Sequence, residues 1–355
     1  MFIALSAGAT IEIILIFAFC TFRGQIKQIV ISGGITVLAA LIMSFFSDVA
    51  GAMILMVWGA LLFGFELIRS LTGKRINRFV PHILSIVLTV IYFTHAFIVA
   101  HGLVTTRYEL DLGSDLRIAQ ISDTHMDSFF DTDDLRKCVE MINRNEPDVV
   151  VITGDLVDEN TTLSDMKETC KILSELKSTY GTFYVPGNHD GHWGENNGVK
   201  DAYRKLEQEM AANDITVLAD KACAIGDDYI LLGRYDEWFS NSAHTKRIPI
   251  KKILERSDLL HTDRKLIVLD HRPINLDSLA DFKDVKVSLV LSGHTHGGQI
   301  FPVTLVYKIF TGKNDNIYGI KKIKDMYSIT SSGASSGQAP FKNTVPNEVV
   351  IIDIK

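Results

Sequence analysis

The sequence predicts a chain in two parts: an N-terminal four-helix transmembrane domain over residues 1–104, followed by an α/β domain over residues 105–355. Four long apolar stretches fill the first part, and the second part alternates short apolar runs with amphipathic segments. A helix needs about 20 apolar residues to cross the hydrocarbon core of a bilayer. Alternation of strands and helices is typical of layered α/β folds. These patterns predict a membrane anchor that carries a globular domain.

Each apolar stretch approaches or exceeds the length that crosses a bilayer, and only short polar or basic loops separate the four. A buried core helix or a signal peptide would explain one stretch, but four in succession favour membrane spans. The second and third are short, so one re-entrant hairpin is an alternative for that pair. Within the spans, Glu12 and His95 are candidates for sensing or partner binding, although hydrogen bonding between helices is commoner. The stretches cover residues 2–22, 29–46, 49–67 and 79–104.

The charges of the loops predict the side of the membrane on which the second part lies. The first and third loops are basic, whereas the second, around Ser47 and Asp48, has no basic residue. Positively charged loops stay in the cytoplasm. We therefore expect a multi-pass integral membrane protein with its catalytic domain on the extracytoplasmic face, and the Lys- and Ile-rich composition fits a bacterial cell membrane. The basic loop residues are Arg23, Lys27, Arg69, Lys74, Arg75 and Arg78.

The net charge argues against nucleic acid as a partner. The whole chain carries −6 and residues 1–104 carry +3, which leaves −9 for residues 105–355. A nucleic-acid backbone requires a basic surface. We therefore expect the protein to associate with the lipid bilayer and not with nucleic acid.

The second part begins with a polar stretch, residues 105–115, that we interpret as a short tether. Beyond it, short apolar runs predict strands, and apolar residues at helical spacing predict two helices, at 131–144 and 164–177. Strands are expected at residues 116–122, 148–153, 182–186, 266–269, 287–292, 326–330 and 349–354.

Polar clusters follow five of these strands at the point where each strand ends. Because ligand sites in α/β sheets lie at the carboxyl ends of strands, we expect the clusters to converge. Seven of their side chains, two Asp, one Asn and four His, are candidate ligands, enough for two divalent ions, and such nitrogen and oxygen ligands suit Mn, Fe or Zn. Paired ions about 3.5–4 Å apart activate water for attack on phosphorus esters. The clusters are Asp123-Thr-His125, Gly154-Asp155, Gly187-Asn188-His189-Asp190, His271 and Gly293-His294-Thr-His296.

The clusters resemble the D-x-H, G-D, G-N-H-[DE], H and G-H-x-H motifs of the calcineurin-like metallophosphoesterase superfamily. The resemblance covers residues 116–355, and the tail from Gly293 to Pro302 is similar to that of the membrane-associated YaeI/YkuE-type phosphodiesterase branch. It implies a two-sheet sandwich flanked by helices. It also implies a binuclear, metal-dependent phosphoesterase that hydrolyses a phosphodiester, with lipid-linked phosphate esters among the candidate substrates, by attack of metal-bridging hydroxide.

The resemblance further implies a role for each matching residue. His189 would be the general acid that protonates the leaving group, hydrogen-bonded to Asp158, and the alternative for His189 is a metal ligand or a supporting donor. Arg272 and Arg234 are candidates for substrate binding, with a surface ion pair as the alternative. One ion would be held by Asp123, His125, Asp155 and His296, and the other by Asp155, Asn188, His271 and His294.

Two positions separate this chain from the phosphoprotein phosphatases of the superfamily. Those enzymes have an arginine after the second aspartate of G-D-x-V-D, where this chain has Glu159, and the third motif here ends in Asp190 rather than Glu. Protein dephosphorylation is therefore disfavoured. A phosphomonoesterase or nucleotide pyrophosphatase is one alternative, and a membrane sensor or scaffold that only binds a ligand is another. The short distance from residue 104 to Asp123 favours a cleft that opens toward the bilayer.

Overall fold

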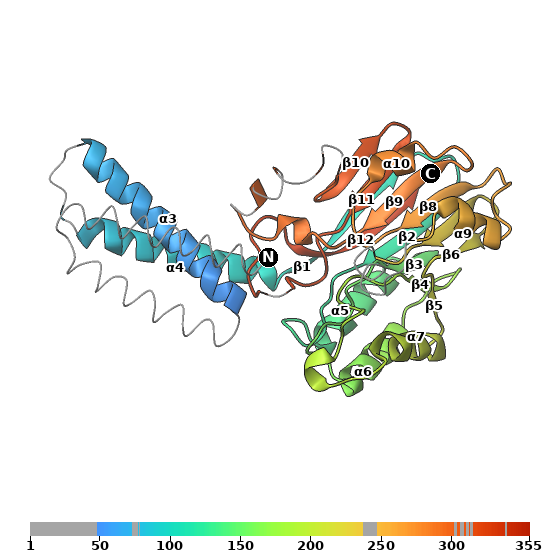
Figure 1. Cartoon of the computed structure of the whole chain (residues 1–355), viewed down its shortest axis with the longest axis horizontal. Coiled ribbons are helices and arrows are strands. Elements are labelled where there is room, and N and C mark those ends of the chain that lie inside the picture. The colour runs from blue at the N-terminus through green and yellow to red at the C-terminus, as the bar shows by residue number, and fades with distance from the viewer. Residues whose placement is uncertain are drawn as a thin grey trace. The chain divides into compact units, whose positions relative to one another are not determined.

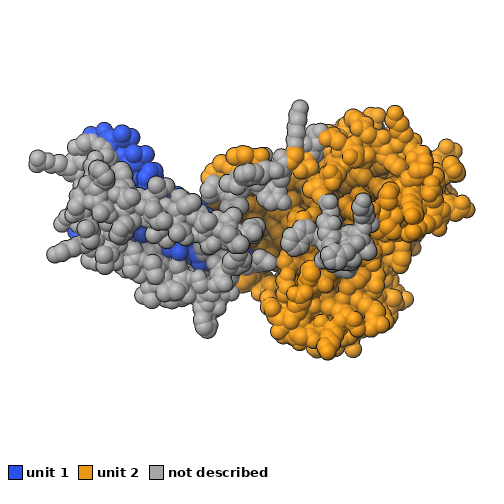
Figure 2. Space-filling view, in the orientation of Figure 1, with its two compact units in different colours: residues 1–98, 338–341 blue, residues 99–337, 342–355 orange. Residues whose placement is uncertain are grey.

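The computed structural model describes residues 48–72, 77, 79–236, 247–301, 304–305, 309, 312, 315–337 and 339–355. The chain divides into two compact units, residues 1–98 with 338–341 and residues 99–337 with 342–355 (Figure 2). The first two predicted spans, together with Glu12, lie outside the described residues. The prediction of four spans therefore stays a prediction.

Among the described residues, two apolar helices precede the α/β part of the chain, α3 (Asp48–Thr72) and α4 (Phe79–Ala100) (Figure 1). They coincide with the third and fourth predicted spans. Within the described ranges, α4 is the one helix long and apolar enough to cross a membrane. The fourth span was predicted to run to residue 104, but the helix ends at Ala100, whose carbonyl accepts a 2.5 Å hydrogen bond from Asn347 Nδ2.

The predicted tether at residues 105–115 is wrong for most of its length. Strand β1 (Leu103–Leu110) pairs in parallel with β12 (Asn347–Ile354), from Leu103 opposite Asn347 to Leu110 opposite Ile354. β1 lies at the edge of its sheet, so its polar side chains face solvent. Only two residues, 101 and 102, separate α4 from the α/β fold.

The described residues of the α/β part form two six-stranded sheets, which confirms the predicted sandwich (Figure 1). All seven predicted strands are present. Residues 215–233 contain three further strands that the sequence did not predict, and residues 319–323 contain one more. The first sheet has the order β1-β12-β2-β3-β4-β5, with β2 (Leu116–Ile121), β3 (Val149–Ile152), β4 (Thr182–Tyr184) and β5 (Ile215–Val217). The second has the order β10-β11-β9-β8-β7-β6, with β6 (Lys221–Ile225), β7 (Tyr229–Gly233), β8 (Lys265–Leu269), β9 (Val287–Ser292), β10 (Gly319–Ile323) and β11 (Met326–Thr330).

Three apolar cores hold the layers together. Alternate residues of a strand point to opposite faces, and in β2 this sends Ile118 into the core between the two sheets and Ile121 into the core under the helices. Helices α5 (Thr132–Asn143), α6 (Leu163–Leu173) and α7 (Ala202–Ala212) cover the outer face of the first sheet. Helices α9 (Ile250–Arg256) and α10 (Leu276–Ala280) cover the second. The layers are therefore helix, sheet, sheet, helix.

Candidate metal centre

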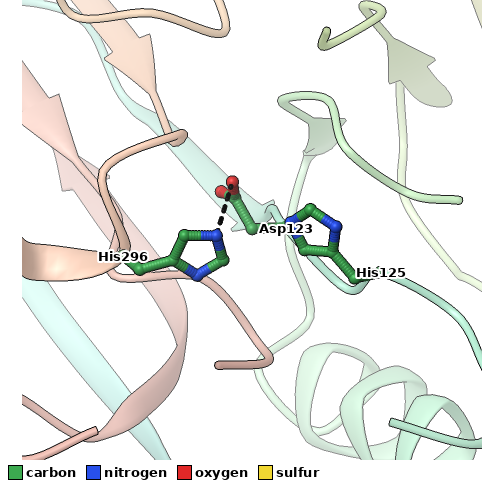
Figure 3. Close-up of side chains that lie close together, drawn as sticks. All are labelled: Asp123, His125 and His296. Atoms are coloured by element: carbon green, nitrogen blue, oxygen red, sulfur yellow. Dashed lines mark ion pairs between the residues drawn. The ribbon is translucent and has the colours of Figure 1, made fainter. Parts of the chain in front are cut away.

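The candidate metal centre lies where loops from the two sheets meet. β2, β3 and β4 are parallel to one another, and so are β8 and β9, so the loops that follow each set of strands emerge at one edge of its sheet. All five predicted clusters meet there, and the ligand atoms within each of three groups of side chains lie within 4.8 Å of one another. The groups are Asp123, His125 and His296 (Figure 3); His125, Asp155 and His189; and Asp155, His271 and His294.

Asp155 belongs to two of these groups. Its Oδ2 lies 3.0 Å from His271 Nε2 and 3.8 Å from His125 Nε2. Burial favours the protonated carboxyl, but His271 and His189 outweigh it and hold the pKa of Asp155 well below its usual range. An ionised carboxylate between two ligand groups is what a shared metal ligand requires, because it offers two anionic oxygens. The His/Asp arrangement is that of a binuclear metal site.

Backbone carbonyls orient two of the histidines. His271 Nδ1 lies 2.8 Å from the carbonyl of Thr153, and His296 Nδ1 lies 3.1 Å from the carbonyl of Ser335. A ring nitrogen that faces a carbonyl must carry the proton, which leaves Nε2 with its lone pair free for a metal. His294 Nδ1 also lies 3.2 Å from His271 Nε2. These two lone pairs can serve one ion.

Buried atoms without hydrogen-bond partners show that the side chains present fit a metal. Both ring nitrogens of His125 and the side-chain oxygen of Asn188 are buried and have no partner among the described residues. Buried polar atoms are nearly always satisfied, and an ion is one thing that satisfies them. A Cβ at Gly337 would lie 3.0 Å from His296 Nε2 and 3.7 Å from His125 Nε2. The glycine therefore keeps that space open.

Five of the seven predicted ligands have left-handed backbone. Non-glycine residues pay roughly 1–2 kcal/mol for this conformation, and such strain collects at functional sites. Here it turns the chain sharply after a strand, so that the ligand side chain points into the centre rather than along the sheet. The five residues are Asp123 (φ 53°), His125 (φ 45°), Asp155 (φ 51°), His294 (φ 71°) and His296 (φ 48°).

Asp190 holds the second and third clusters together, a role that the sequence reading missed. Its buried carboxylate accepts four backbone N–H groups, from Gly187 (2.7 Å), Asp155 (2.8 Å), Leu156 (2.9 Å) and Val157 (3.1 Å). A carboxylate is the side chain that can accept this many bonds at once. The only signal in the sequence was an acid directly after the Asn188-His189 pair.

The prediction that Asp158 contacts His189 is wrong in this structure. His189 Nδ1 lies 3.0 Å from Glu159 Oε1, whereas Asp158 accepts the hydroxyl of Ser128 and the backbone N–H of Asn160. The turn after Asp155 points Asp158 away, and the longer Glu159 reaches the imidazole. Burial opposes the charged ring, but Asp155 and the bond to Glu159 outweigh it and raise the pKa of His189 to about 9.

The two predicted substrate-binding arginines are already held in ion pairs. Arg272 Nε lies 2.8 Å from Asp236, and Arg234 lies 3.2 Å from Asp270, which also binds Arg247. Both aspartates are buried. Arg272 borders the centre, because its charge helps to lower the pKa of His294, after the larger effects of burial and of His271. A role in substrate binding stays a prediction for both arginines.

A two-sheet α/β sandwich with an Asp/His cluster where the sheets' loops meet defines a class of metal-dependent phosphoesterases. The chain belongs to the calcineurin-like phosphoesterase family, whose sequence profile matches residues 116–298.

Similar proteins span bacteria and animals. An uncharacterized metallophosphoesterase of Helicobacter pylori strain J99 is 33% identical over 241 residues, 68% of this chain and 60% of that protein. The uncharacterized metallophosphoesterase YkuE of Bacillus subtilis is 27% identical over 67% of this chain and 79% of its own length. A transmembrane protein with metallophosphoesterase domain of Bos taurus is 28% identical over 60% of this chain and 47% of its own length. The match thus spans about 60% of the Helicobacter relative.

Proposed function

We propose that this chain is a membrane-anchored phosphoesterase that hydrolyses a phosphodiester, lipid-linked in its natural form. Residues 103–355 form the hydrolytic domain, because β1 begins at Leu103, and the residues before them form a four-span anchor that leaves the domain on the extracytoplasmic face. The observation that carries the proposal is the pair of side-chain groups that share Asp155, one of which includes the candidate general acid His189. A site that only bound a ligand would not need a general acid next to its metal ligands.

Two divalent ions, with Mn, Fe or Zn as the candidates, supply Lewis acidity and an activated water for attack on phosphorus. Each side chain has a separate task in holding them. Asp155, which belongs to two of the side-chain groups, would be shared by both ions, and Asn188, whose buried oxygen has no hydrogen-bond partner among the described residues, would bind the second. The first ion would be held by Asp123, His125, Asp155 and His296, and the second by Asp155, Asn188, His271 and His294.

His189 delivers the proton that the leaving alkoxide needs. Glu159 binds Nδ1, so Nε2 is the nitrogen left to donate. The ring packs edge-on against His125, with centroids 4.9 Å apart, which holds it beside the ligand groups. Transfer of a proton to the leaving oxygen avoids release of a free alkoxide.

The length of the connection supports a substrate in or near the membrane. α4 is long and apolar enough to span a bilayer, and β1 begins three residues after its end. A chain extends at most about 3.5 Å per residue, so the domain stays close to the end of the helix. The name of the Bos taurus relative joins a transmembrane protein to a metallophosphoesterase domain in the same way.

The test uses the full chain in detergent, stripped of metal and reloaded with Mn²⁺. A fragment that begins at residue 105 is unsuitable, because it would cut β1 and remove Leu103, which packs on the core under the helices. We expect cleavage of an aryl phosphodiester faster than the matching monoester, with loss of activity in Asp155→Asn and His189→Ala. Faster monoester cleavage would instead make it a phosphomonoesterase. If two metals are bound and neither substrate is cleaved, the result would favour a membrane sensor or scaffold.

A further inference from the structure

The loop of residues 332–335 lies directly against two candidate ligands of the first ion. The backbone N–H of Ser335 donates to the carbonyl of Asp123 (3.2 Å), and the carbonyl of Ser335 faces His296 Nδ1 at 3.1 Å. A Cβ at Gly333 would lie 2.8 Å from the Cβ of Asp123. The contact is so close that a shift of the loop would displace both ligands.

Lys342 fixes the first residue of this loop. Its ammonium is fully buried and donates to the carbonyl of Ser332 and, at 2.9 Å, to Asn347 Oδ1. A buried cation costs free energy that an apolar side chain of similar length would avoid. What the ammonium supplies is direction, because it holds the Ser332 carbonyl and the Asn347 amide at set positions around one nitrogen.

Asn347 connects Lys342 to the end of α4. Its Oδ1 accepts from Lys342, and its Nδ2 donates to the carbonyl of Ala100 at 2.5 Å. Ala100 is the last residue of α4, and the final carbonyls of a helix have no partner within the helix. A path of hydrogen bonds thus runs from the end of α4 to the 332–335 loop. The four residues along it, Ala100, Asn347, Lys342 and Ser332, are each at most 6% exposed.

We propose that Lys342 and Asn347 are positioning residues for the first metal ion, and that the end of α4 is part of the support of its site. The last carbonyl of α4 fixes Asn347, and Asn347 orients Lys342. Lys342 in turn holds the 332–335 loop against Asp123 and His296. The inference rests on the proposed function for the assignment of ligands to each ion.

A purely structural role for Asn347 makes a different prediction. Asn347 begins β12 and lies opposite Leu103 of β1, where it would only help to close the edge of the sheet. Its loss would then loosen the whole domain and weaken the binding of both ions alike. A positioning role predicts a loss confined to the first ion.

The test is a titration of the metal-stripped full chain in detergent with Mn²⁺, in which the free ion is counted by electron paramagnetic resonance. His125→Ala and Asn188→Ala identify which binding step belongs to the first ion and which to the second. Asn347→Asp keeps the acceptor for Lys342 and removes the donor to Ala100. We expect its dissociation constant for the first ion to rise about tenfold or more, and that for the second to stay unchanged. The added negative charge by itself favours a cation, so weaker binding reports the lost contact.

Asn145→Asp is the matched control. Asn145 Nδ2 donates to the carbonyl of Met141 on α5 (2.6 Å), and its Oδ1 accepts from Arg107, so this amide also joins a helix carbonyl to a cation. We expect both dissociation constants of Asn145→Asp to match those of the unmodified chain. Lys342→Met should weaken the first ion as Asn347→Asp does. Because Asn347→Asp preserves the size of the side chain, the result does not depend on whether Lys342→Met folds.

Two results for Asn347→Asp would overturn the proposal: constants that match the unmodified chain, and constants that weaken equally for both ions. Binding of fewer than two ions by the unmodified chain would refute the metal assignment itself, and this inference with it. Selective weakening in a chain that binds two ions and cleaves no diester would support the positioning role and refute only the reaction.

Discussion

The carboxylate of Asp190 accepts the backbone N–H of Asp155 at 2.8 Å. This hydrogen bond connects the loop that carries the candidate ligand Asn188 to the loop that carries the shared ligand Asp155. Because the same carboxylate accepts three more N–H groups, Asp190→Asn would set an amide donor against backbone donors. We expect a loss of about 2–4 kcal/mol in the free energy of unfolding and lower metal content. Thermal unfolding and metal analysis test this. Asp134→Asn, at an exposed ion pair, should change neither, and a normal metal content in Asp190→Asn would refute the role.

The contact between His189 and Glu159 predicts a pH effect. A general acid works while protonated, so kcat/KM falls as the pH rises through the pKa of His189, which is raised to about 9 in the metal-free centre. Bound cations disfavour the charged imidazolium of His189, so in the metal-loaded enzyme the fall in kcat/KM, the alkaline limb of the pH profile, occurs at lower pH. Glu159→Gln removes the carboxylate that favours imidazolium, and we expect the limb to move a further unit or so toward acid, about 1.4 kcal/mol.

Asp158→Asn is the matched control for this profile, because Asp158 binds Ser128 and not the imidazole. We expect it to shift the limb less than Glu159→Gln does. His189→Ala should lower kcat by about 10²- to 10⁴-fold with metal content preserved. If the limb shifts more in Asp158→Asn than in Glu159→Gln, Asp158 and not Glu159 would be the acid that orients the His189 imidazole.

Removal of metal should destabilise the fold around the buried atoms that lack partners. A ligand at 100 times its dissociation constant stabilises the folded state by about 2.7 kcal/mol. We expect Mn²⁺ to raise the Tm of the stripped full chain, and His125→Ala and Asn188→Ala to reduce that rise. His192→Ala, whose imidazole pairs with Glu195 outside the cluster, should respond like the unmodified chain. A Tm that is insensitive to Mn²⁺ in the unmodified chain would contradict the assignment.

Lys342 predicts a pH-dependent stability. Its ammonium is buried and donates to Ser332 and, at 2.9 Å, to Asn347; burial lowers its pKa to about 7, although Glu348 opposes the shift. An unfolded lysine has a pKa of about 10.4, so between the two values the unfolded chain binds a proton that the folded chain lacks. Stability should therefore rise from pH 7 toward pH 10, by at most about 1.4 kcal/mol per unit.

The measurement for Lys342 is Tm against pH in the full chain. Lys342→Met should flatten the profile across this range, and Lys355→Met, at an exposed lysine, should leave it unchanged. A slope that persists in Lys342→Met would assign the titration to another group.

The short connection after α4 predicts a dependence on where the substrate lies. A flexible insert of six residues between Gly102 and Leu103 should slow cleavage of a phosphodiester embedded in vesicles and spare a soluble one. The same insert between Asp227 and Asp228, in the turn from β6 to β7, should affect neither rate. Equal rates on the two substrates with the insert at Gly102 would contradict a membrane-proximal site.

Local patterns predicted the site well because its ligands sit at strand ends. An apolar run that stops at Asp123 or Asp155 is visible in the sequence, and parallel strands bring such ends together without further information. Local patterns failed where the pairing partner is distant. β1 has the polar side chains of a tether, and only hydrogen bonding to β12, more than 240 residues later, makes it a strand.

By itself, the sequence determined the alternation of strands and helices, the seven candidate ligands and, through the motifs, the resemblance to the family, because these depend on periodicity and on residue types at fixed spacing. The two-sheet sandwich followed from that resemblance and not from the periodicity. Only the tertiary structure decided which neighbour supports a catalytic group. Asp158 and Glu159 are adjacent acids of equal charge, and the direction of one turn gives His189 to the longer of them. The same holds for Asp190, whose four hydrogen bonds join loops more than 30 residues apart in the chain. A composition or a motif cannot specify such contacts, since they depend on where the fold places backbone donors in space.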